Sequence, residues 1–378
     1  MITEEIAYRR ESRYFKGDPV IWYIVVALSV ISILVVYSAT QSLAYKQSLN
    51  NPEKYLIKHT SLVVLALVVM WIAHRIDYRF YARLSLLALY LSVPLLLITL
   101  VFGPTINEAT RWLTIPLIEQ SFQPSDLAKL ALIAHLAAML SKRQQNIESV
   151  KESLFPMLVW IGVICGLIAI SNFSNAAMLF ATSLLIMFIG RVPIRYFLIL
   201  LVIGGLSISF ALVEGQRFET AVSRWEAYKK SLYDSDNAHP QAQESYMAIA
   251  SGGITGKGPG NSDQRNFLPH PYSDFIFAII VEEYGLLGGA LVVFLYLALL
   301  YRAMMIMAQS NRAFGGILAA GLAFSLVIQA MIHMSVAVGL VPITGLPLPL
   351  LSMGGTSLLF TGISIGVILS VSRGDIIE

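Results

Sequence analysis

Three carboxylates stand in one apolar segment of the sequence, LPHPYSDFIFAIIVEEYGLLGG, at residues 268–289. Asp274 lies near the start of this segment, and Glu282 and Glu283 lie inside it. An unpaired carboxylate within a membrane costs at least ~2.5 kcal/mol, so such groups are either paired or functional. A single well-placed carboxylate can act as a general base that takes a proton from an attacking hydroxyl.

Helical geometry separates these three carboxylates. A helix that begins at Pro271 would place Asp274 in its first turn, where the dipole favours an anion by ~0.3–1 kcal/mol. Glu282 and Glu283 would then lie about 12 and 13.5 Å farther along the axis. These separations exceed the ~6.5–9.5 Å between paired glycosidase carboxylates. We therefore expect Asp274 to be separate from the glutamates, which are predicted to be structural and paired with helices inside the bundle.

Composition assigns the chain to the integral membrane proteins. Of its 378 residues, 56% are hydrophobic and 13% are charged, values that soluble domains do not show. The formal charge of +3 is too small to indicate nucleic-acid binding. The one cysteine, Cys165, lies in an apolar run, which excludes a disulfide framework and a cysteine-based metal site. The first 18 residues are polar and basic, so the next segment is predicted to be a retained spanning helix.

Apolar runs near the ~20 residues that a bilayer requires predict an all-α bundle of ten transmembrane helices. We treat residues 1–378 as one membrane domain with a large extracytoplasmic loop at 214–271, which contains one helix near 218–232. The division between the fifth and sixth spans depends on the short turn SNFSN at 171–175. The predicted spans are 20–40, 58–74, 83–103, 124–141, 155–171, 173–190, 193–213, 272–301, 313–337 and 351–371.

The distribution of basic residues predicts that both termini are cytoplasmic. The short segments on the side of the termini hold fifteen Lys and Arg residues, and the opposite short loops hold four. Cytoplasmic loops carry such an excess of basic residues. Joining the fifth and sixth spans would remove this bias, so ten spans are retained.

Three other polar motifs allow both a functional and a purely structural interpretation. GGITGKGPGNS at 252–262 fails the P-loop pattern because Lys257 precedes Gly258 rather than Ser or Thr; it predicts either a flexible loop or a backbone nest for phosphate. Asp126 and Lys129 are spaced to pair on one helix face, and they form either a self-neutralising pair or a headgroup site. His333, in the ninth span, is either a packing residue or a proton relay. Zinc and serine-hydrolase motifs are absent from the sequence.

Five ordered motifs resemble the SEDS family (shape, elongation, division and sporulation), the membrane glycosyltransferases of bacterial cell-wall synthesis. They cover nearly the whole chain, and the opening segment is more similar to the division branch than to the elongation branch. The motifs are VVYSAT (35–40), RWL…FQPSDLAKL (111–130), SGGITGKGPGNS (251–262), LPHPYSDFIFAIIVEEYGLLGG (268–289) and VPITGLPLPLLSMGGTSLL (341–359).

The resemblance implies a substrate and a site. The family polymerises lipid II, an undecaprenyl-diphosphate-linked disaccharide-pentapeptide, outside the cytoplasmic membrane, and its essential aspartate matches Asp274. We expect Asp274 to deprotonate the acceptor hydroxyl, with basic side chains holding the diphosphates, with or without a divalent cation (Mg²⁺ or Mn²⁺). No other cofactor is expected. The predicted substrate-binding residues are Arg111, Asp126, Lys129, Arg224, Lys257, Arg265, Ser352, Gly354 and Gly355.

The chain departs from the family pattern at three positions. Asn172 stands where the family commonly has an acidic residue, His333 replaces an asparagine, and Met353 replaces a tyrosine. No role of that acidic residue can be transferred to this chain.

The resemblance leaves two other functions open, a lipid II flippase and a structural partner, and it also allows an elongation-type polymerase. It implies a multi-pass protein of the bacterial inner membrane, located at the division septum. The implied partners are a class B penicillin-binding protein docked helix to helix, other divisome proteins and membrane lipids. Small residues of the ninth span would permit such docking, and internal packing explains them equally well: Gly315, Gly316, Ala319, Ala320 and Ala323.

Overall fold

The computed structural model describes residues 16–46, 52–103, 105–106, 109–115, 120–144, 152, 154–197, 200, 202, 218–233 and 239–377. Helices dominate this part of the chain. Their bounds are α2 (Pro19–Lys46), α3 (Pro52–Arg75), α4 (Tyr78–Phe102), α5 (Pro124–Lys142), α6 (Phe155–Ser171), α7 (Phe173–Ile189), α9 (Phe218–Tyr233), α10 (Pro240–Gly252), α11 (Ile276–Gln309), α12 (Ala313–Ala337) and α13 (Thr356–Ile377).

Nine of the ten predicted spans coincide with described helices, so a mainly helical membrane protein is confirmed. Within the described residues, six helices are long and apolar enough to cross a membrane, namely α2, α3, α4, α11, α12 and α13, and α6 and α7 are shorter apolar helices. The predicted span 193–213 lies mostly outside the described residues. The number of ten spans therefore stays a prediction.

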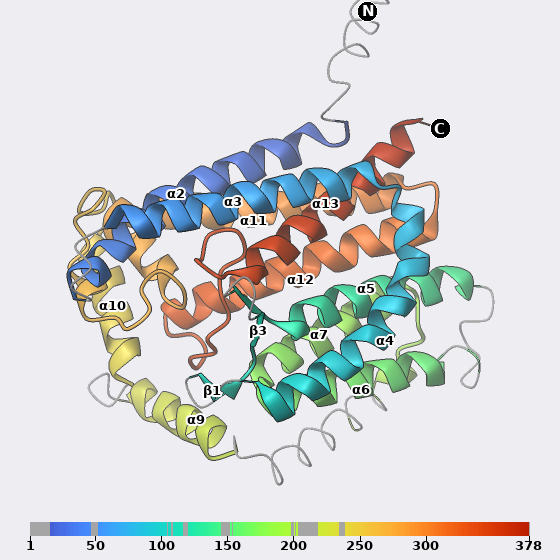
Figure 1. The fold of residues 1–378 in the computed structure, drawn as a ribbon, viewed down its shortest axis with the longest axis horizontal. Coiled ribbons are helices and arrows are strands. Elements are labelled where there is room, and N and C mark those ends of the chain that lie inside the picture. Colours follow the sequence, from blue (N-terminus) through green and yellow to red (C-terminus); the bar gives the residue numbers. More distant parts are fainter. Residues whose placement is uncertain are drawn as a thin grey trace, which may run out of the picture.

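The helices form two groups joined by α12. In Figure 1, α2, α3, α11, α12 and α13 run roughly side by side, and α4 to α7 form a second group beneath them. Because α12 contacts α11 and α13 as well as α5 and α7, it lies in the interior of the bundle. The small residues of α12 that were considered for docking a partner helix are all buried inside the bundle and serve internal packing: Gly315, Gly316, Ala319, Ala320 and Ala323.

One partly buried ion pair lies at the end of the bundle where α2 begins. Arg302 of α11 donates from Nε to a carboxylate oxygen of Asp18 at 2.8 Å, and the Asp18 amide donates to Ser372 of α13 at 2.8 Å. The start of α2 and the end of α13 therefore lie at one end of the bundle, with α10 at the other end (Figure 1).

The turn between α6 and α7 shows why the fifth and sixth spans are separate helices. Asn172 leaves helical geometry, and its side-chain oxygen accepts a hydrogen bond from the Asn175 amide at 3.2 Å. Asparagine is among the best residues for this N-terminal cap. The residue that departs from the family pattern thus caps α7.

Two features between the helices were not predicted. Residues 105–122 contain two short antiparallel sheets, β1 (Thr105–Ile106) with β2 (Ala109–Thr110) and β3 (Leu113–Ile115) with β4 (Gln120–Phe122). The predicted extracytoplasmic loop contains α10 as well as the expected α9. The prediction of one helix in this loop was wrong because α10 is short, and most of its residues are small or polar.

Helix α11 is broken at Gly285, which has φ +70° and ψ −171°. The amides of Leu286 and Leu287 donate to the carbonyls of Gly253 and Ile254, at 3.0 and 3.3 Å. In exchange, the carbonyls of Glu282 and Glu283 accept from the amides of Lys257 and Gly258, each at 2.9 Å. Non-helical backbone at membrane depth is tolerated where protein satisfies its polar groups, and residues 253–258 do so here.

Only glycine fits this backbone exchange. A Cβ at Gly285 would lie 2.1 Å from the Ile254 carbonyl oxygen, and a Cβ at Gly256 (φ +82°) would lie 2.2 Å from that of Glu283. Both positions also need a positive φ, which glycine adopts without steric cost. The glycine-rich motif is therefore a docking surface for the helix break.

Candidate active site

Asp274 lies in a turn that precedes α11. Its amide donates to the His270 carbonyl at 3.1 Å, and α11 begins at Ile276 with Phe275 as its N-cap. The prediction that Asp274 lies in the first helical turn was therefore wrong. The predicted distances of about 12 and 13.5 Å from Asp274 to the two glutamates assumed a continuous helix. Because α11 begins only at Ile276, these helical distances do not hold for Asp274.

The carboxylate of Asp274 has an uncharged setting. The Ser273 hydroxyl donates to Oδ1 at 2.9 Å, and Gly345 packs beside Oδ2. Among the described residues, no Lys or Arg forms an ion pair with Asp274, and its side chain is half-buried. The carboxylate is thus held in place without being neutralised.

The segment that joins α12 to α13 holds the turn of Asp274. The Ser352 hydroxyl donates to the Ser273 carbonyl at 2.7 Å, and the Met353 amide donates to the Tyr272 carbonyl at 3.0 Å. Ser352 also accepts a hydrogen bond from the Leu348 amide at 2.8 Å. The structure therefore brings two predicted site residues, Ser352 and Asp274, close together. Gly354 and Gly355 follow in the same segment, and α13 begins at Thr356 rather than at residue 351.

Helices α11 and α12 fix this segment in turn. His333 donates from Nδ1 to the Leu346 carbonyl at 2.8 Å, and Gln329 donates to the Pro347 carbonyl at 2.8 Å. The hydroxyl of Tyr296 donates to the Pro349 carbonyl. His333 is buried and its Nε2 has no partner within the described part of the chain, so it supports the Asp274 segment through Nδ1.

The predicted pair of α5 is formed. Lys129 Nζ lies 2.8 Å from Asp126 Oδ1, and both side chains are largely buried. They line a cavity of about 30 Å³ between α5, α12 and α13, together with Gln329. Because Gln329 also holds the Asp274 segment, this cavity and the Asp274 turn share one side chain.

Arg111 lies on the same side of the bundle as the start of α5. Its Nε donates to the Ser171 carbonyl at the end of α6, at 3.2 Å. The Asn175 amide group donates to Ser125 at 3.2 Å, and the Gln123 amide donates to the hydroxyl of Thr356 at 3.3 Å. Polar groups therefore connect the start of α5 with the start of α13.

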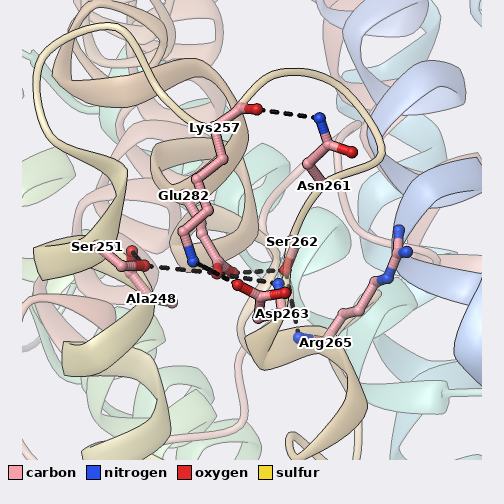
Figure 2. A network of polar contacts seen from close by, with 8 residues as sticks. All are labelled: Ala248, Ser251, Lys257, Asn261, Ser262, Asp263, Arg265 and Glu282. Carbon is pink, nitrogen blue, oxygen red and sulfur yellow. Dashed lines mark hydrogen bonds and ion pairs between the residues drawn. The ribbon is translucent and has the colours of Figure 1, made fainter.

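Glu282 has a saturated polar environment, which Figure 2 shows. One carboxylate oxygen, Oε1, accepts from Lys257 Nζ at 2.7 Å and from the Asp263 amide at 3.0 Å. The other, Oε2, accepts from the Ser262 hydroxyl at 2.5 Å. The predicted pairing of Glu282 with a neighbouring helix is met only by Ser251 at the end of α10, whose hydroxyl donates to Oε1 at 3.4 Å. The closer donors, Lys257, Ser262 and the Asp263 amide, come from the loop that follows α10.

Glu283 contacts a different element. It accepts a hydrogen bond from Ser38 of α2, and Arg265 donates to the same serine hydroxyl at 3.1 Å. Arg265 also donates to the Ser38 carbonyl at 3.2 Å. The interhelical pairing predicted for Glu283 is confirmed, and Arg265 joins α2 to the segment before α11.

Lys257 serves this network rather than an open site. Beside Glu282, Lys257 lies 2.9 Å from Asp263. Hydrogen bonds to Glu282 and Asp263 raise the pKa of Lys257, and the hydrogen bond from Lys257 lowers the pKa of Asp263. The amides of Lys257 and Gly258 donate to carbonyls of α11, so they do not form the phosphate nest considered from the sequence.

Arg224 lines a separate pocket of about 140 Å³ between α9, α10 and residues 341–343. Its Nη1 donates to the Ile343 carbonyl at 3.3 Å. Ile343 is two residues before Gly345, which packs beside Asp274. The pocket therefore borders the same segment that holds the candidate catalytic residue.

Sequence reasoning missed Gln329, a polar residue whose only sequence signal is its place in an apolar element, which is a weak guide to function. Ser262 belongs to the glycine-rich motif at 252–262, but its bond to Glu282 was not predicted. As for metal, the described residues contain no cluster of three or more His, Cys, Asp or Glu side chains that could hold an ion. The expected divalent cation therefore stays a prediction, and no step of the chemistry is assigned to it.

Comparisons with known proteins show the family of the chain. The profile of the FtsW/RodA/SpoVE family, described as cell cycle proteins, matches residues 18–375. The chain is 30% identical to a probable peptidoglycan glycosyltransferase FtsW of Trichlorobacter lovleyi, covering 97% of this chain and 96% of the relative. It is 33% identical to the protein of the same description from Nitrosococcus halophilus, covering 92% and 89%.

Solved structures share the fold. A chain of a peptidoglycan synthase complex superposes with a TM-score of 0.76 at 24% identity, covering 96% of this chain and 99% of that chain. The rod shape determining protein RodA of Thermus thermophilus gives a TM-score of 0.68 at 24% identity, covering 96% and 98%. With the family match over most of its length and relatives of at least 30% identity, this chain belongs to the FtsW/RodA/SpoVE family.

Proposed function

We propose that this chain is a peptidoglycan glycosyltransferase that polymerises lipid II into glycan strands at the outer face of the bacterial cytoplasmic membrane. The relatives named above carry this activity in their descriptions, and they are of the division type, FtsW. We assign the chain to septal wall synthesis on this basis. An elongation-type role is the nearest alternative within the family.

The observation that carries the proposal is the setting of Asp274. Its carboxylate is positioned by Ser273 and by the segment 345–353, yet the described residues provide no cation that would neutralise it. Such a carboxylate remains available as a general base. The buried glutamates of α11 are not available as general bases, because their oxygens either accept hydrogen bonds from the protein or are enclosed by it.

The proposed step transfers one sugar. Asp274 takes the proton from the 4-hydroxyl of the acceptor GlcNAc as that oxygen attacks the anomeric carbon of the donor MurNAc. The new C–O bond forms as the bond to the diphosphate breaks, and undecaprenyl diphosphate leaves with the bonding electrons. The α-phosphate linkage is thereby inverted to a β-1,4 bond. Positive groups near the site stabilise the leaving diphosphate.

The proposed topology has ten spans, with both termini in the cytoplasm. The common position of the start of α2 and the end of α13, opposite α10, supports it (Figure 1). We also propose a single-span class B penicillin-binding protein as the partner that crosslinks the product. The similarity to a chain of a peptidoglycan synthase complex supports this assignment.

Purified protein in liposomes tests the function. With labelled lipid II and a cognate transpeptidase, we expect polymer that is resolved on a gel. Translocation of lipid II without polymer would instead establish a flippase. The absence of both translocation and polymer would establish a structural role. Either result would overturn the proposal.

A further inference from the structure

Arg224 differs from the other cations that the sequence predicts to hold diphosphate. Lys129 is paired with Asp126 at 2.8 Å, and Lys257 is paired with Glu282 at 2.7 Å. Arg265 is bound to Ser38 beside Glu283, and Arg111 to the Ser171 carbonyl. Like Arg111, Arg224 donates to a neutral carbonyl, here that of Ile343, but Arg224 also lines the pocket of about 140 Å³. It therefore presents a full positive charge and unused donors.

The pocket at Arg224 has the groups that an oxyanion needs. It is lined by Arg224 and Tyr228 of α9, by Gln241 and Tyr246 of α10, and by His239 at the N-cap position of α10. Its volume of about 140 Å³ exceeds the ~30 Å³ that one liquid water occupies, so a phosphate-sized group fits. The N-terminus of α10 adds the partial positive charge of a helix dipole.

The electrostatics of His239 agree with a positive pocket. Burial first, and then the charge of Arg224, lower the pKa of His239. The imidazole is therefore neutral at neutral pH, and it can donate one hydrogen bond without adding charge. Arg224 is thus the main positive charge among the described residues that line the pocket.

The pocket is connected to the Asp274 turn by a short stretch of chain. Tyr228 donates to the Leu340 carbonyl at 2.8 Å, and Arg224 donates to the Ile343 carbonyl. Gly345, two residues farther on, packs beside Asp274. A polymerase must hold a donor and an acceptor at the same time, and each lipid-linked molecule carries a diphosphate.

We propose that the pocket between α9, α10 and residues 341–343 binds the phosphate-type anion of one of the two lipid-linked substrates, with Arg224 as its main contact. The inference rests on the proposed function, because it assigns the anion to the substrate of that reaction. It goes beyond that function by placing the anion at Arg224 and not at Lys129, whose charge is already paired with Asp126.

Binding is tested on the purified full-length chain with inorganic pyrophosphate as the probe, by calorimetry. We expect Arg224→Gln to weaken pyrophosphate binding at least tenfold, and Arg224→Lys to restore most of it. Lys229→Gln is the matched control, because Lys229 is an exposed cation on the same helix that does not line the pocket; its binding should stay within twofold of wild type. Unchanged binding in Arg224→Gln would overturn the site.

The source of the anion is tested by lipid II polymerisation with the partner transpeptidase present. We expect Arg224→Gln to raise the KM for lipid II at least tenfold while kcat stays within threefold. Loss of pyrophosphate binding with an unchanged KM would show a site for free phosphate and overturn the substrate assignment. If the wild-type protein makes no polymer but its pyrophosphate binding depends on Arg224, the proposed function fails and the anion pocket stands.

Discussion

Asp274 and Glu282 stand eight residues apart in the sequence, yet the structure surrounds them with opposite kinds of groups. The carboxylate of Asp274 accepts one hydrogen bond from Ser273 and is half-buried. That of Glu282 is fully buried and accepts bonds from Lys257, Ser262 and the Asp263 amide. A buried carboxylate whose oxygens are all occupied by donors is stabilised as a charge and cannot easily take a proton from a substrate. A carboxylate with few donors stays available for proton transfer.

The supports of the two regions differ in the same way. The Asp274 turn is held through backbone carbonyls, by Ser352 directly and by His333 and Gln329 through the segment 346–347. The Glu282 region is held by an ion pair and by the backbone exchange at Gly285. The scaffold of Asp274 fixes the position of the carboxylate without forming an ion pair with it in the described part of the chain. We therefore assign catalysis to the first region and structural integrity to the second.

Asp274→Asn should have the largest effect on activity. The amide keeps the size of the side chain and its contact with Ser273 but cannot accept a proton. Loss of a general base costs about 10²–10⁴ in rate, so we expect polymerisation of lipid II to fall by that factor. The melting temperature in detergent should match wild type. Full polymerisation by this variant would remove Asp274 from the mechanism.

Lys257→Met should reverse this profile, with a large loss of stability. Removing one partner of a fully buried pair costs about 3–5 kcal/mol, because the other charge stays buried; Glu282 is fully buried but the Lys257 side chain is 27% exposed, so we expect a cost toward or below the lower end of this range. We expect a lower melting temperature, and the protein that remains folded should keep its rate. The double variant Lys257→Met/Glu282→Gln removes both charges and should recover part of the loss. Equal melting temperatures for the single variant and wild type would show that the ion pair is not structural.

The different surroundings of Asp274 and Glu282 could be predicted from the sequence only in part. Apolar runs locate the helices because ~20 apolar residues are needed to cross a bilayer, and the spacing of Asp126 and Lys129 predicts their pair because both lie on one helix face. The partner of Glu282 could not be predicted in this way. Lys257 is twenty-five residues earlier in the chain, and it reaches Glu282 only because residues 253–258 bond to the helix break.

The position of Asp274 depends on an equally non-local cause. Pro271 suggests a helix start, but Ser352 and Met353 bond the carbonyls of Ser273 and Tyr272 from a segment about eighty residues later. The turn is therefore fixed by tertiary contacts, and α11 starts at Ile276. Arg224 and Ile343 are similarly remote in sequence, so the pocket that they border carries no local signal.

Substitutions of His333 test the neutral scaffold of Asp274 with a smaller expected effect. The amide nitrogen of asparagine lies near the position of Nδ1, whereas that of glutamine lies nearer Nε2. We expect His333→Asn to keep the bond to the Leu346 carbonyl and polymerise within twofold of wild type. His333→Gln should lose that bond, at a cost of ~1–3 kcal/mol for the unsatisfied group, and kcat should fall about tenfold. Equal kcat values for the two variants would contradict positioning through Nδ1.

Asp263→Asn should have the smallest effect and shows where the Glu282 network ends. Asp263 is exposed, and ion pairs at exposed positions contribute little to stability because water screens them. Since Lys257 lowers the pKa of Asp263 below 3.8, any stabilisation by its charge is present above that pH and is lost as the pH falls through the lowered value. We expect nearly equal melting temperatures for Asp263→Asn and wild type at pH 7, and any small difference should disappear as the pH falls below about 4, in thermal melts across that range. A large loss at pH 7 would move Asp263 into the buried network, and the saturation of Glu282 would then depend on three charges rather than on the pair with Lys257.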